Sequence, residues 1–244
     1  MIASKYCLVT GASGDIGEAC TRQLAAAGYS VYCHYRQHEE KVRHLIGELT
    51  ITYPQQDFFP VQGDFTQDSV LETFNESIFQ LDGIIFAHGG TIYDLLTEHS
   101  STDFDTMWQT HLKRPIQFCQ NFQSKLSSQQ NGRIIFISSV YGLIGSSMEV
   151  LYSTLKGGQL AFTNAYAKEV ASLGITVNAI APGAVDTHMN QDWTKEETEE
   201  LLESIPLNRM ARPDEIASLA LFLMSDNARY ITGTTLPITG GWKI

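Results

Sequence analysis

The chain has 244 residues, enough for one α/β domain with a large core, and its 43% hydrophobic and 18% charged residues are typical of a globular protein. Its formal net charge of −11 repels phosphate backbones and anionic lipids, so neither a nucleic acid nor a membrane is an expected partner. The four cysteines form no C-x-x-C pair and the histidines show no metal-ligand grouping, which indicates a reducing compartment and no metal site.

The first apolar run, residues 6–10, is expected to be a buried strand, and the glycine-containing turn Gly11-Ala12-Ser13-Gly14-Asp15-Ile16-Gly17 follows it. A helical pattern then covers residues 18–27, and a second strand is expected at 30–35. Strand, glycine turn and helix are the context of a dinucleotide-binding turn, although a plain tight turn has the same local pattern. The apolar run is too short for a secretory signal and no segment reaches the length of a membrane span, so we expect the cytoplasm.

The second strand ends at Tyr35 without the acidic residue that would bind the ribose hydroxyls of NAD. Arg36 follows instead, and the next acid is Glu39. Because an arginine there can bind the 2′-phosphate of NADP, the pattern favours NADPH/NADP over NADH. The alternative is that Arg36 is a solvated loop cation.

Strands and helices continue to alternate along the rest of the chain. A long helix at 102–126 is expected to bend at Pro115, and a substrate loop is expected at about 187–207. The other expected strands are 58–62, 83–87, 133–139, 175–180 and 234–238, and the other expected helices are 39–50, 69–79, one ending near 173, 194–205 and one from Pro213. The whole chain, 1–244, is therefore predicted to be a single-domain Rossmann-like, doubly wound parallel sheet of about seven strands with helices on both faces.

Ligands of such sheets bind outside the carboxyl ends of the strands. The polar and glycine residues that stand out in this chain all follow expected strand ends, which predicts that they share one edge of the sheet. They are the glycine turn, Arg36, Asp64, His88, Ser139 and Pro182-Gly183.

Tyr152 and Lys156 are four residues apart, so a helix would place the phenol and the ammonium on one face. A lysine cation beside a tyrosine favours the phenolate and should lower the tyrosine pKa, which suits a proton donor near neutral pH. Ser139 ends the expected strand 133–139, where its hydroxyl could hold a carbonyl oxygen beside the phenol.

With these residues in order, the chain resembles the short-chain dehydrogenase/reductase family, in particular its 3-oxoacyl-acyl-carrier-protein reductase branch, which the segments 177–183, 212–217 and 230–233 also resemble. The resemblance implies hydride transfer from a nicotinamide to a ketone, with Tyr152 as proton donor, Lys156 on the nicotinamide ribose and Ser139 orienting the carbonyl. It also implies a homo-oligomer, a tetramer or a dimer. The cofactor would lie against Gly11, Ser13, Gly14, Asp15, Ile16, Gly17, Arg36, Asp64, Phe65, Ala87, His88, Gly89, Tyr152, Lys156, Pro182, Gly183, Val185 and Thr187.

The chain departs from the family pattern at four places, which are Gly14, where NADP enzymes often have a basic residue, Asp15, the segment Phe86-Ala87-His88-Gly89 and His111. Asp15 stands where the turn has its middle glycine, and its carboxylate is expected to point outward. His111 stands where the family has a catalytic Asn on the long helix. An imidazole can also donate or accept a proton, so His111 is a candidate fourth catalytic residue; the alternative is that it only packs.

The substrate-side segment contains Glu149, three residues before Tyr152. A carboxylate there suits a cationic substrate group, with Asp94 or Asp186 as further candidates, although a local salt bridge or cap is the alternative. Three features together resemble the bacterial reductases that convert the 5-aminopentanone on a lysine of elongation factor P to the alcohol: Glu149-Val150-Leu151-Tyr152, His111 followed by Pro115, and Gly183-Ala184-Val185-Asp186-Thr187. The predicted substrate is therefore a ketone that is carried on a protein.

Two other functions remain open. One is a 3-oxoacyl-acyl-carrier-protein reductase of fatty-acid synthesis, against which the net charge of −11 and the uncharged Gln130 and Leu173 argue, because an acidic carrier needs basic docking residues. The other is a non-catalytic NADP-binding regulator, which has little reason to retain Ser139, Tyr152 and Lys156 together.

Overall fold

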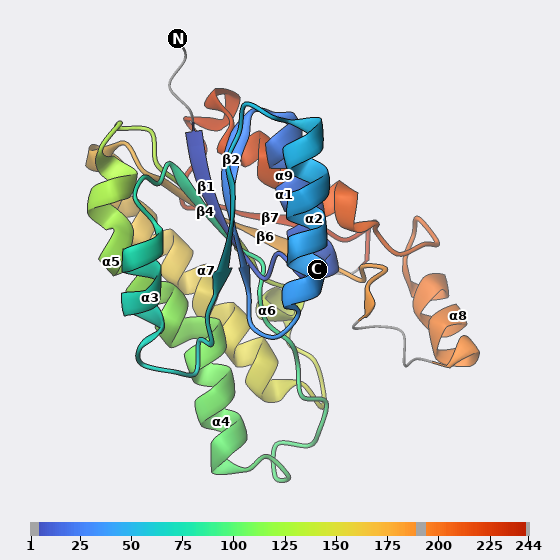
Figure 1. Ribbon diagram of the computed structural model, residues 1–244. Coiled ribbons are helices and arrows are strands. Elements are labelled where there is room, and N and C mark those ends of the chain that lie inside the picture. Colours follow the sequence, from blue (N-terminus) through green and yellow to red (C-terminus); the bar gives the residue numbers. More distant parts are fainter. Residues whose placement is uncertain (1–4, 189–193, 243–244) are drawn as a thin grey trace.

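Figure 1 shows the computed structural model, in which one sheet lies between two layers of helices. The structure describes residues 5–188 and 194–242. All the strands are parallel, in the order β3-β2-β1-β4-β5-β6-β7. They are β1 Lys5–Thr10, β2 Tyr29–Tyr35, β3 Phe58–Gln62, β4 Gly83–Phe86, β5 Arg133–Ile137, β6 Thr176–Pro182 and β7 Thr235–Ile238. The predicted Rossmann-like, doubly wound sheet is confirmed.

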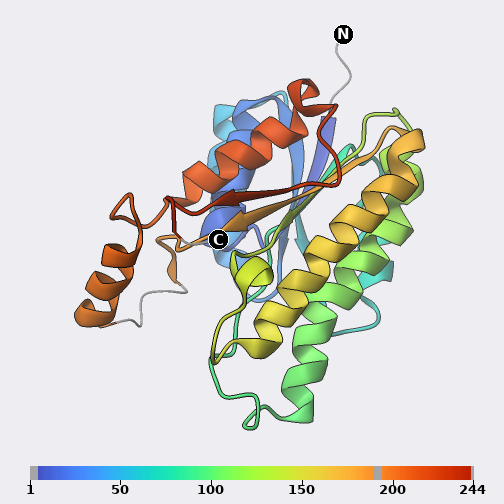
Figure 2. The ribbon, with the colours of Figure 1, turned by 180° about the vertical axis from the view of Figure 1, so that it is seen from behind.

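Helices α1, α2 and α9 cover one face of the sheet, and α3, α5 and α7 cover the other, as the two opposite views show (Figures 1 and 2). The helices are α1 Asp15–Ala26, α2 Glu39–Thr52, α3 Val70–Ser77, α4 Ser101–Trp108, α5 Arg114–Ser127, α6 Tyr141–Ile144, α7 Val150–Val170, α8 Lys195–Ser204 and α9 Pro213–Met224. Short 3₁₀ turns follow α7 at Ala171–Leu173 and α9 at Asp226–Ala228.

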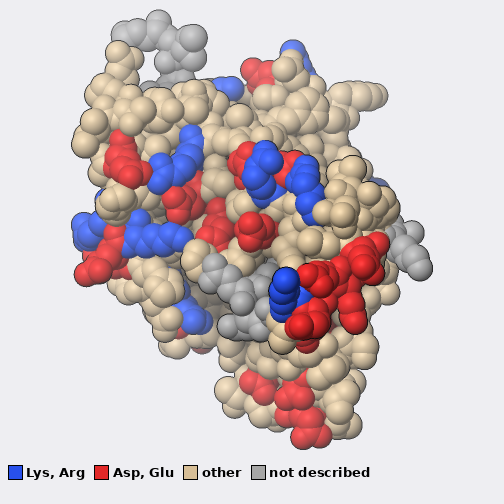
Figure 3. Space-filling model, turned by 90° about the vertical axis from the view of Figure 1, so that its right-hand side faces the viewer, with Lys and Arg blue, Asp and Glu red and all other residues tan. Residues whose placement is uncertain are grey.

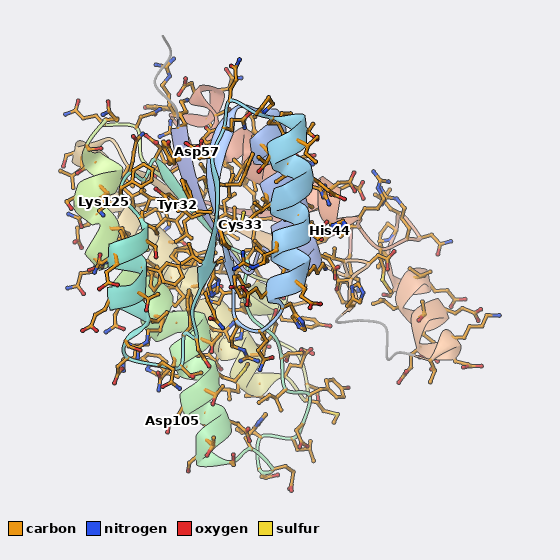
Figure 4. The ribbon with its side chains drawn as sticks, in the orientation of Figure 1. Tyr32, Cys33, His44, Asp57, Asp105 and Lys125 are labelled. Carbon is orange, nitrogen blue, oxygen red and sulfur yellow. The ribbon has the colours of Figure 1, made fainter. Side chains whose placement is uncertain are left out.

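The two faces of the sheet have separate apolar cores. Every residue of β2 is buried, which is the pattern of a parallel strand that is covered on both sides. Successive side chains of a strand point to opposite faces, so Tyr32 packs in the core under α3 and α5, whereas Cys33 packs in the core under α1 and α2 (Figure 4). The β-branched and aromatic runs of the sequence therefore form a sheet that is buried from both sides.

The carboxyl ends of the central strands lie at one edge, because Thr10 at the end of β1 is paired with Phe86 at the end of β4. The strand order reverses direction between β1 and β4, and a crevice for a ligand is expected at such a point. The glycine turn after β1 and the segment from Ala87 after β4 therefore start side by side.

The long helix expected at 102–126 is interrupted rather than merely bent at Pro115. Helix α4 ends at Trp108, a π-helical turn covers Gln109–Lys113, and α5 begins at Arg114. Proline has no N–H and its ring excludes a regular α-helical turn before it, which explains why the irregular turn immediately precedes Pro115. The short helix α6 was also not predicted.

Among residues 5–188 and 194–242, no helix is both long enough and apolar enough to cross a bilayer.

His34 in β2 holds the glycine turn in place. Its Nδ1 accepts the Gly11 N–H at 3.0 Å, and its Nε2 lies 3.0 Å from the Gly63 carbonyl, which can only accept, so Nε2 carries the proton. Its ring stacks on Phe65 with 4.9 Å between centroids. Burial lowers the pKa of His34 to about 4, so the imidazole is neutral near pH 7.

We predict that this neutral imidazole makes stability depend on pH. Above the ordinary value of 6.5, His34 is neutral in the folded and the unfolded chain. As the pH falls from 6.5 to about 4, only the unfolded chain takes up the proton, so the free energy of unfolding should decrease. The expected loss is up to roughly 3 kcal/mol.

Chemical denaturation at a series of pH values measures this loss, and His34→Gln is the matched control. A glutamine can accept from Gly11 and donate to Gly63 without titrating in this range. The variant should lose less stability than the wild type between pH 6.5 and about 4. Equal losses in both proteins would contradict the assignment to His34.

Candidate active site

Helix α7 is clamped to the end of β5 by Lys156. Its Nζ donates to the Ile137 carbonyl at 2.9 Å, and the Ser138 hydroxyl donates to the Lys156 carbonyl at 3.1 Å. The Nζ also lies 5.5 Å from the centroid of the Tyr152 ring. Lys156 is therefore buried between the strand end and the tyrosine, on the helix face that the four-residue spacing predicted.

The Ser139 side chain lies close enough to Tyr152 to act on the phenol, and it lowers the tyrosine pKa. Ser139 follows β5 and is buried, and its Oγ also accepts the Tyr141 N–H at 3.1 Å, which orients the hydroxyl at the start of α6. The structure therefore brings Ser139, Tyr152 and Lys156 together, as the sequence predicted.

The ionisation of this group differs from our prediction. Burial raises the pKa of Tyr152 to about 12, the charges of Glu149 and Tyr141 act in the same direction, and only the hydrogen bond from Ser139 opposes them. Burial also lowers the pKa of Lys156 to about 7. The expected lowering of the tyrosine pKa by the lysine is thus wrong for this environment, because desolvation penalises both charged forms and outweighs their attraction.

His111 lies in the π-helical turn, with its ring edge-on to Tyr152 at 5.7 Å between centroids. Its Nε2 is 2.8 Å from the Gly90 carbonyl, so Nε2 carries the proton, while Nδ1 is buried and has no hydrogen-bond partner among the residues that the structure describes. Burial and the charge of Lys156 lower the pKa of His111 to about 3. The fourth candidate is therefore a neutral imidazole with a bare nitrogen next to the tyrosine.

Glu149 directly precedes α7, and its side chain is buried, with 8% of its surface exposed. Its Oε1 accepts the Thr91 hydroxyl at 2.9 Å, and Ser146 supplies a second hydroxyl hydrogen bond. Burial raises the pKa of Glu149, and these two bonds act in the opposite direction. Within the described part of the chain no Lys or Arg pairs with this carboxylate, so the local salt bridge considered from the sequence is not seen there.

The glycine turn has the close packing that a phosphate-binding turn needs. A side chain at Gly17 would place its Cβ 2.1 Å from the Gly11 carbonyl oxygen, so the first turn of α1 can approach the loop only because residue 17 is glycine. Gly14 precedes Asp15, the first residue of α1, and no side chain of the described residues caps the amides of this helix start. The residues present therefore fit a pyrophosphate, with the Gly11 amide already bound to His34.

Arg36 and Asp64 line one cleft of about 500 Å³ at the ends of β2 and β3, together with Gln62 and Gly63. The Arg36 side chain is exposed there. Asp64 Oδ1 accepts from the N–H and the hydroxyl of Thr66, which fixes the loop after β3.

Two other predicted cofactor residues, Phe65 and Asp15, lie in different surroundings. Phe65 is buried between the rings of His34 and His88, so its side chain packs inside rather than facing the cleft. The Asp15 carboxylate accepts the His188 N–H at 2.8 Å and lies 3.8 Å from Lys41 Nζ, so it contacts the start of the expected substrate loop.

The segment after β6 continues along the same edge. The Val140 N–H bonds to the Pro182 carbonyl at 2.8 Å, the Gly183 N–H bonds to the Ile238 carbonyl, and Val185 forms a bridge with Ala211. Thr187 is half-buried beside His188. Residues 189–193 of the expected substrate loop lie outside the described residues, and α8 occupies its second half.

Sequence reasoning missed three residues of this region: Thr91, Gln159 and His34. Gln159 is buried three residues after Lys156, and its Nε2 donates to the His111 carbonyl at 2.7 Å. A glutamine on the apolar, buried face of a helix was the available signal, because such a group needs a partner. Thr91 gave no comparable signal, since its role depends on a contact with Glu149, 58 residues away.

Comparison with known proteins identifies related sequences over almost the full chain. The family profile described as Enoyl-(Acyl carrier protein) reductase matches residues 11–243. An uncharacterized oxidoreductase of Bacillus subtilis, YmfI, is 38% identical, with 98% of this chain and 99% of that protein covered. The 3-oxoacyl-[acyl-carrier-protein] reductase FabG of Staphylococcus aureus is 36% identical, with 99% of each covered.

Solved structures share the fold. The NADPH-dependent reductase YwfH, which is involved in bacilysin biosynthesis, superimposes with a TM-score of 0.90 at 22% identity, with 99% of each chain covered. A blue fluorescent protein from a metagenomic library, solved in complex with NADPH, superimposes with a TM-score of 0.91 at 27% identity, with 98% of each chain covered.

We predict that Gly89 must lack a side chain because His111 occupies the space. A Cβ at residue 89 would lie 2.4 Å from His111 Cε1, and its φ of +131° is rarely adopted by other residues. Gly89→Ala should therefore lower the free energy of unfolding by more than about 2 kcal/mol.

Gly90→Ala is the matched control, because a Cβ there would meet nothing within 4 Å. This variant should stay within about 0.5 kcal/mol of the wild type. Chemical denaturation of both variants measures the difference, and equal stabilities would show that His111 does not fill this space.

Proposed function

We propose that this chain reduces ketones with NADPH. The premise is that it belongs to the short-chain dehydrogenase/reductase family and is an oxidoreductase of ketone and alcohol groups. The observation that carries this proposal is the assembly of Ser139, Tyr152 and Lys156 on the sheet edge that also carries the glycine turn. We further propose a homo-oligomer that works in the cytoplasm, by analogy with the family.

The residues that would hold the cofactor lie along that edge. The turn at Gly11–Gly17 would bind the pyrophosphate, the cleft of Arg36 and Asp64 would take the adenosine end, and Lys156 would contact the nicotinamide ribose. When bound, the reduced nicotinamide supplies a hydride to the ketone carbon.

The chain's own residues would manage the oxygen and the proton. Tyr152 donates its phenolic proton to the carbonyl oxygen, and the Ser139 hydroxyl holds the same oxygen. Lys156, whose pKa lies at about 7, can exchange a proton near neutral pH. His111, with its bare Nδ1 beside Tyr152, is placed to accept a hydrogen bond in this path.

NADPH is favoured over NADH by the residues around the adenosine cleft. Arg36 can neutralise a 2′-phosphate, and β2 ends without an acid that would repel it. Two structural neighbours are described as an NADPH-dependent reductase and as a complex with NADPH, which supports the same choice.

Glu149 supports a ketone that carries a positive charge. A buried carboxylate is costly unless a cation or several donors compensate it, and the described partners of Glu149 are neutral hydroxyls. Its charge reaches Tyr152, because it contributes to the raised tyrosine pKa. An amine on the substrate would compensate the carboxylate, and the 5-aminopentanone on a lysine of elongation factor P has such an amine.

The surface charge is compatible with a substrate on a basic protein segment. Figure 3 shows acidic side chains gathered over α8, and this helix has the sequence KEETEELLES. Together with the net charge of −11, it would attract a cationic partner and repel an acidic one.

The second candidate is reduction of 3-oxoacyl groups on an acyl carrier protein. It is favoured by the 36% identity to the Staphylococcus aureus FabG over the full length of both chains. The acidic surface and the buried carboxylate argue against it, because an acyl carrier is itself acidic and its acyl group is neutral.

We predict that Tyr152→Phe lowers kcat by about 10²–10⁴-fold, because it removes the proton donor and leaves the ring that packs beside His111 and Lys156. NADPH oxidation with an acetoacetyl thioester or an amino-ketone measures kcat, and fluorescence titration measures NADPH affinity, which should not change. If the wild type bound NADPH tightly but reduced no ketone, the result would favour the alternative of a non-catalytic NADP-binding regulator.

We predict that Glu149→Gln lowers kcat/KM for an amino-ketone by about tenfold or more, because it removes the charge and keeps the side-chain volume. The loss for a ketone of the same length with a methyl group in place of the amine should be small. Glu98→Gln, which neutralises an exposed carboxylate in the loop after β4, is the control and should change kcat/KM for neither ketone. Equal losses of Glu149→Gln on both ketones would make Glu149 structural.

A further inference from the structure

The π-helical turn before α5 leaves a backbone carbonyl without its usual donor. The Arg114 N–H bonds to the Gln109 carbonyl, five residues back. Residue 115 would be next in line to donate to Thr110 in this pattern, or to His111 in a regular α-helix, but Pro115 has no N–H. Because a single N–H is missing, one of these two carbonyls lacks a backbone donor; Thr110 is half-buried and His111 is buried, so side-chain donors are needed there.

Two side chains from distant parts of the chain supply these donors. His88, in the segment after β4, places Nε2 2.9 Å from the Thr110 carbonyl, and Gln159 on α7 donates Nε2 to the His111 carbonyl at 2.7 Å. They are 22 and 48 residues away in sequence from the carbonyls they contact. We call His88 and Gln159 the brace of the π-turn.

The hydrogen bonds of His88 show which of its ring nitrogens carries the proton. Because the Thr110 carbonyl can only accept, Nε2 carries the proton, and Nδ1 accepts from the Thr10 hydroxyl at 2.6 Å. Thr10 is the last residue of β1, immediately before the glycine turn. His88 thus connects the π-turn to the strand end that carries the expected cofactor turn.

Gln159 connects the π-turn to the other side of the site. It lies three residues after Lys156 on α7, so the two side chains share a face of that helix. It is buried, and its Oε1 has no hydrogen-bond partner among residues 5–188 and 194–242. Among these residues, the Gln159 amide therefore only donates, and its acceptor is the His111 carbonyl.

The ring that the brace would position is that of His111. Its Nε2–H bonds to the Gly90 carbonyl at 2.8 Å, and its ring is nearly perpendicular to that of Tyr152, with an interplanar angle of 87°. Because the backbone of His111 belongs to an irregular turn, regular helix bonding does not fix the position of this ring.

We propose that His88 and Gln159 are positioning residues for catalysis: they donate to carbonyls of the π-turn where Pro115 lacks an N–H, hold this turn and thereby fix the His111 ring against Tyr152. This inference rests on the proposed reductase function for its kinetic readout, but its structural part does not.

The first test is Gln159→Leu, which keeps much of the volume and removes the donor. Loss of position at the His111 ring should lower kcat by about 10–10²-fold, while KM for NADPH changes by less than about twofold. The pH profile of kcat should shift as well, because the environment of Tyr152 and Lys156 changes. Steady-state NADPH oxidation over a pH series measures all three quantities.

Thr163→Val is the matched control. Thr163 is buried one turn further along α7, and its hydroxyl has no partner in the described part of the chain. This variant removes a buried polar group of the same helix without touching the π-turn, so kcat and the pH profile should stay as in the wild type. An effect of Thr163→Val equal to that of Gln159→Leu would overturn the inference.

The second test restores the missing donor. Pro115→Ala supplies an N–H at residue 115, so Gln159→Leu should cost clearly less activity in the Pro115→Ala background than in the wild-type background. Additive effects of the two substitutions would overturn the link between the brace and Pro115. His88→Gln, which keeps a donor for the Thr110 carbonyl, should retain more activity than His88→Leu.

The third readout does not need activity. Nitrogen-15 NMR of labelled imidazoles should show His111 as a neutral Nε2–H tautomer with one environment in the wild type and in Thr163→Val. In Gln159→Leu the signal should broaden or split. If the wild type reduced no ketone but this difference appeared, the proposed function would fail and the brace would stand; an unchanged His111 signal in Gln159→Leu would overturn the brace.

Discussion

The burial of Lys156 against the end of β5 is the interaction on which the rest of the site depends. Its ammonium donates to the Ile137 carbonyl, and its own carbonyl accepts from Ser138, so helix and strand hold each other at two points. These two bonds hold α7, which carries Tyr152, next to the end of β5, after which Ser139 follows. The same contact removes the ammonium from water, and burial therefore lowers the pKa of Lys156 to about 7.

The sequence was sufficient for the architecture and for the main chemical groups. Alternating apolar segments and turn residues predicted the parallel sheet, and the four-residue spacing placed Tyr152 and Lys156 on one helix face. The spacing could not predict their ionisation. Attraction between two charges is visible in a sequence, whereas the depth of burial is a property of the folded chain, and here desolvation raises the pKa of Tyr152 to about 12.

The remaining residues of the site could not be predicted because their roles depend on contacts between distant segments. Pro115 indicates an irregular helix, but it does not say which carbonyls lose a donor or where replacement donors come from. His88 and Gln159 fill these positions only because β4 and α7 lie on either side of the π-turn. Phe65, expected to line the cofactor site, is buried for the same kind of reason: it packs between the imidazoles of His34 in β2 and His88 in the segment after β4.

The unusual residues of the site fit one another, and this fit bears on whether the protein is an enzyme. Loss of selection on a catalytic centre leaves isolated substitutions with unmatched neighbours. Here the imidazole of His111 occupies the space beside Gly89, bonds to Gly90 and has its backbone held by Gln159. A regulator that only bound a cofactor would have no need of a matched set around the tyrosine. The mutual dependence of these residues therefore argues that the chain has a rearranged catalytic centre rather than a degenerate one.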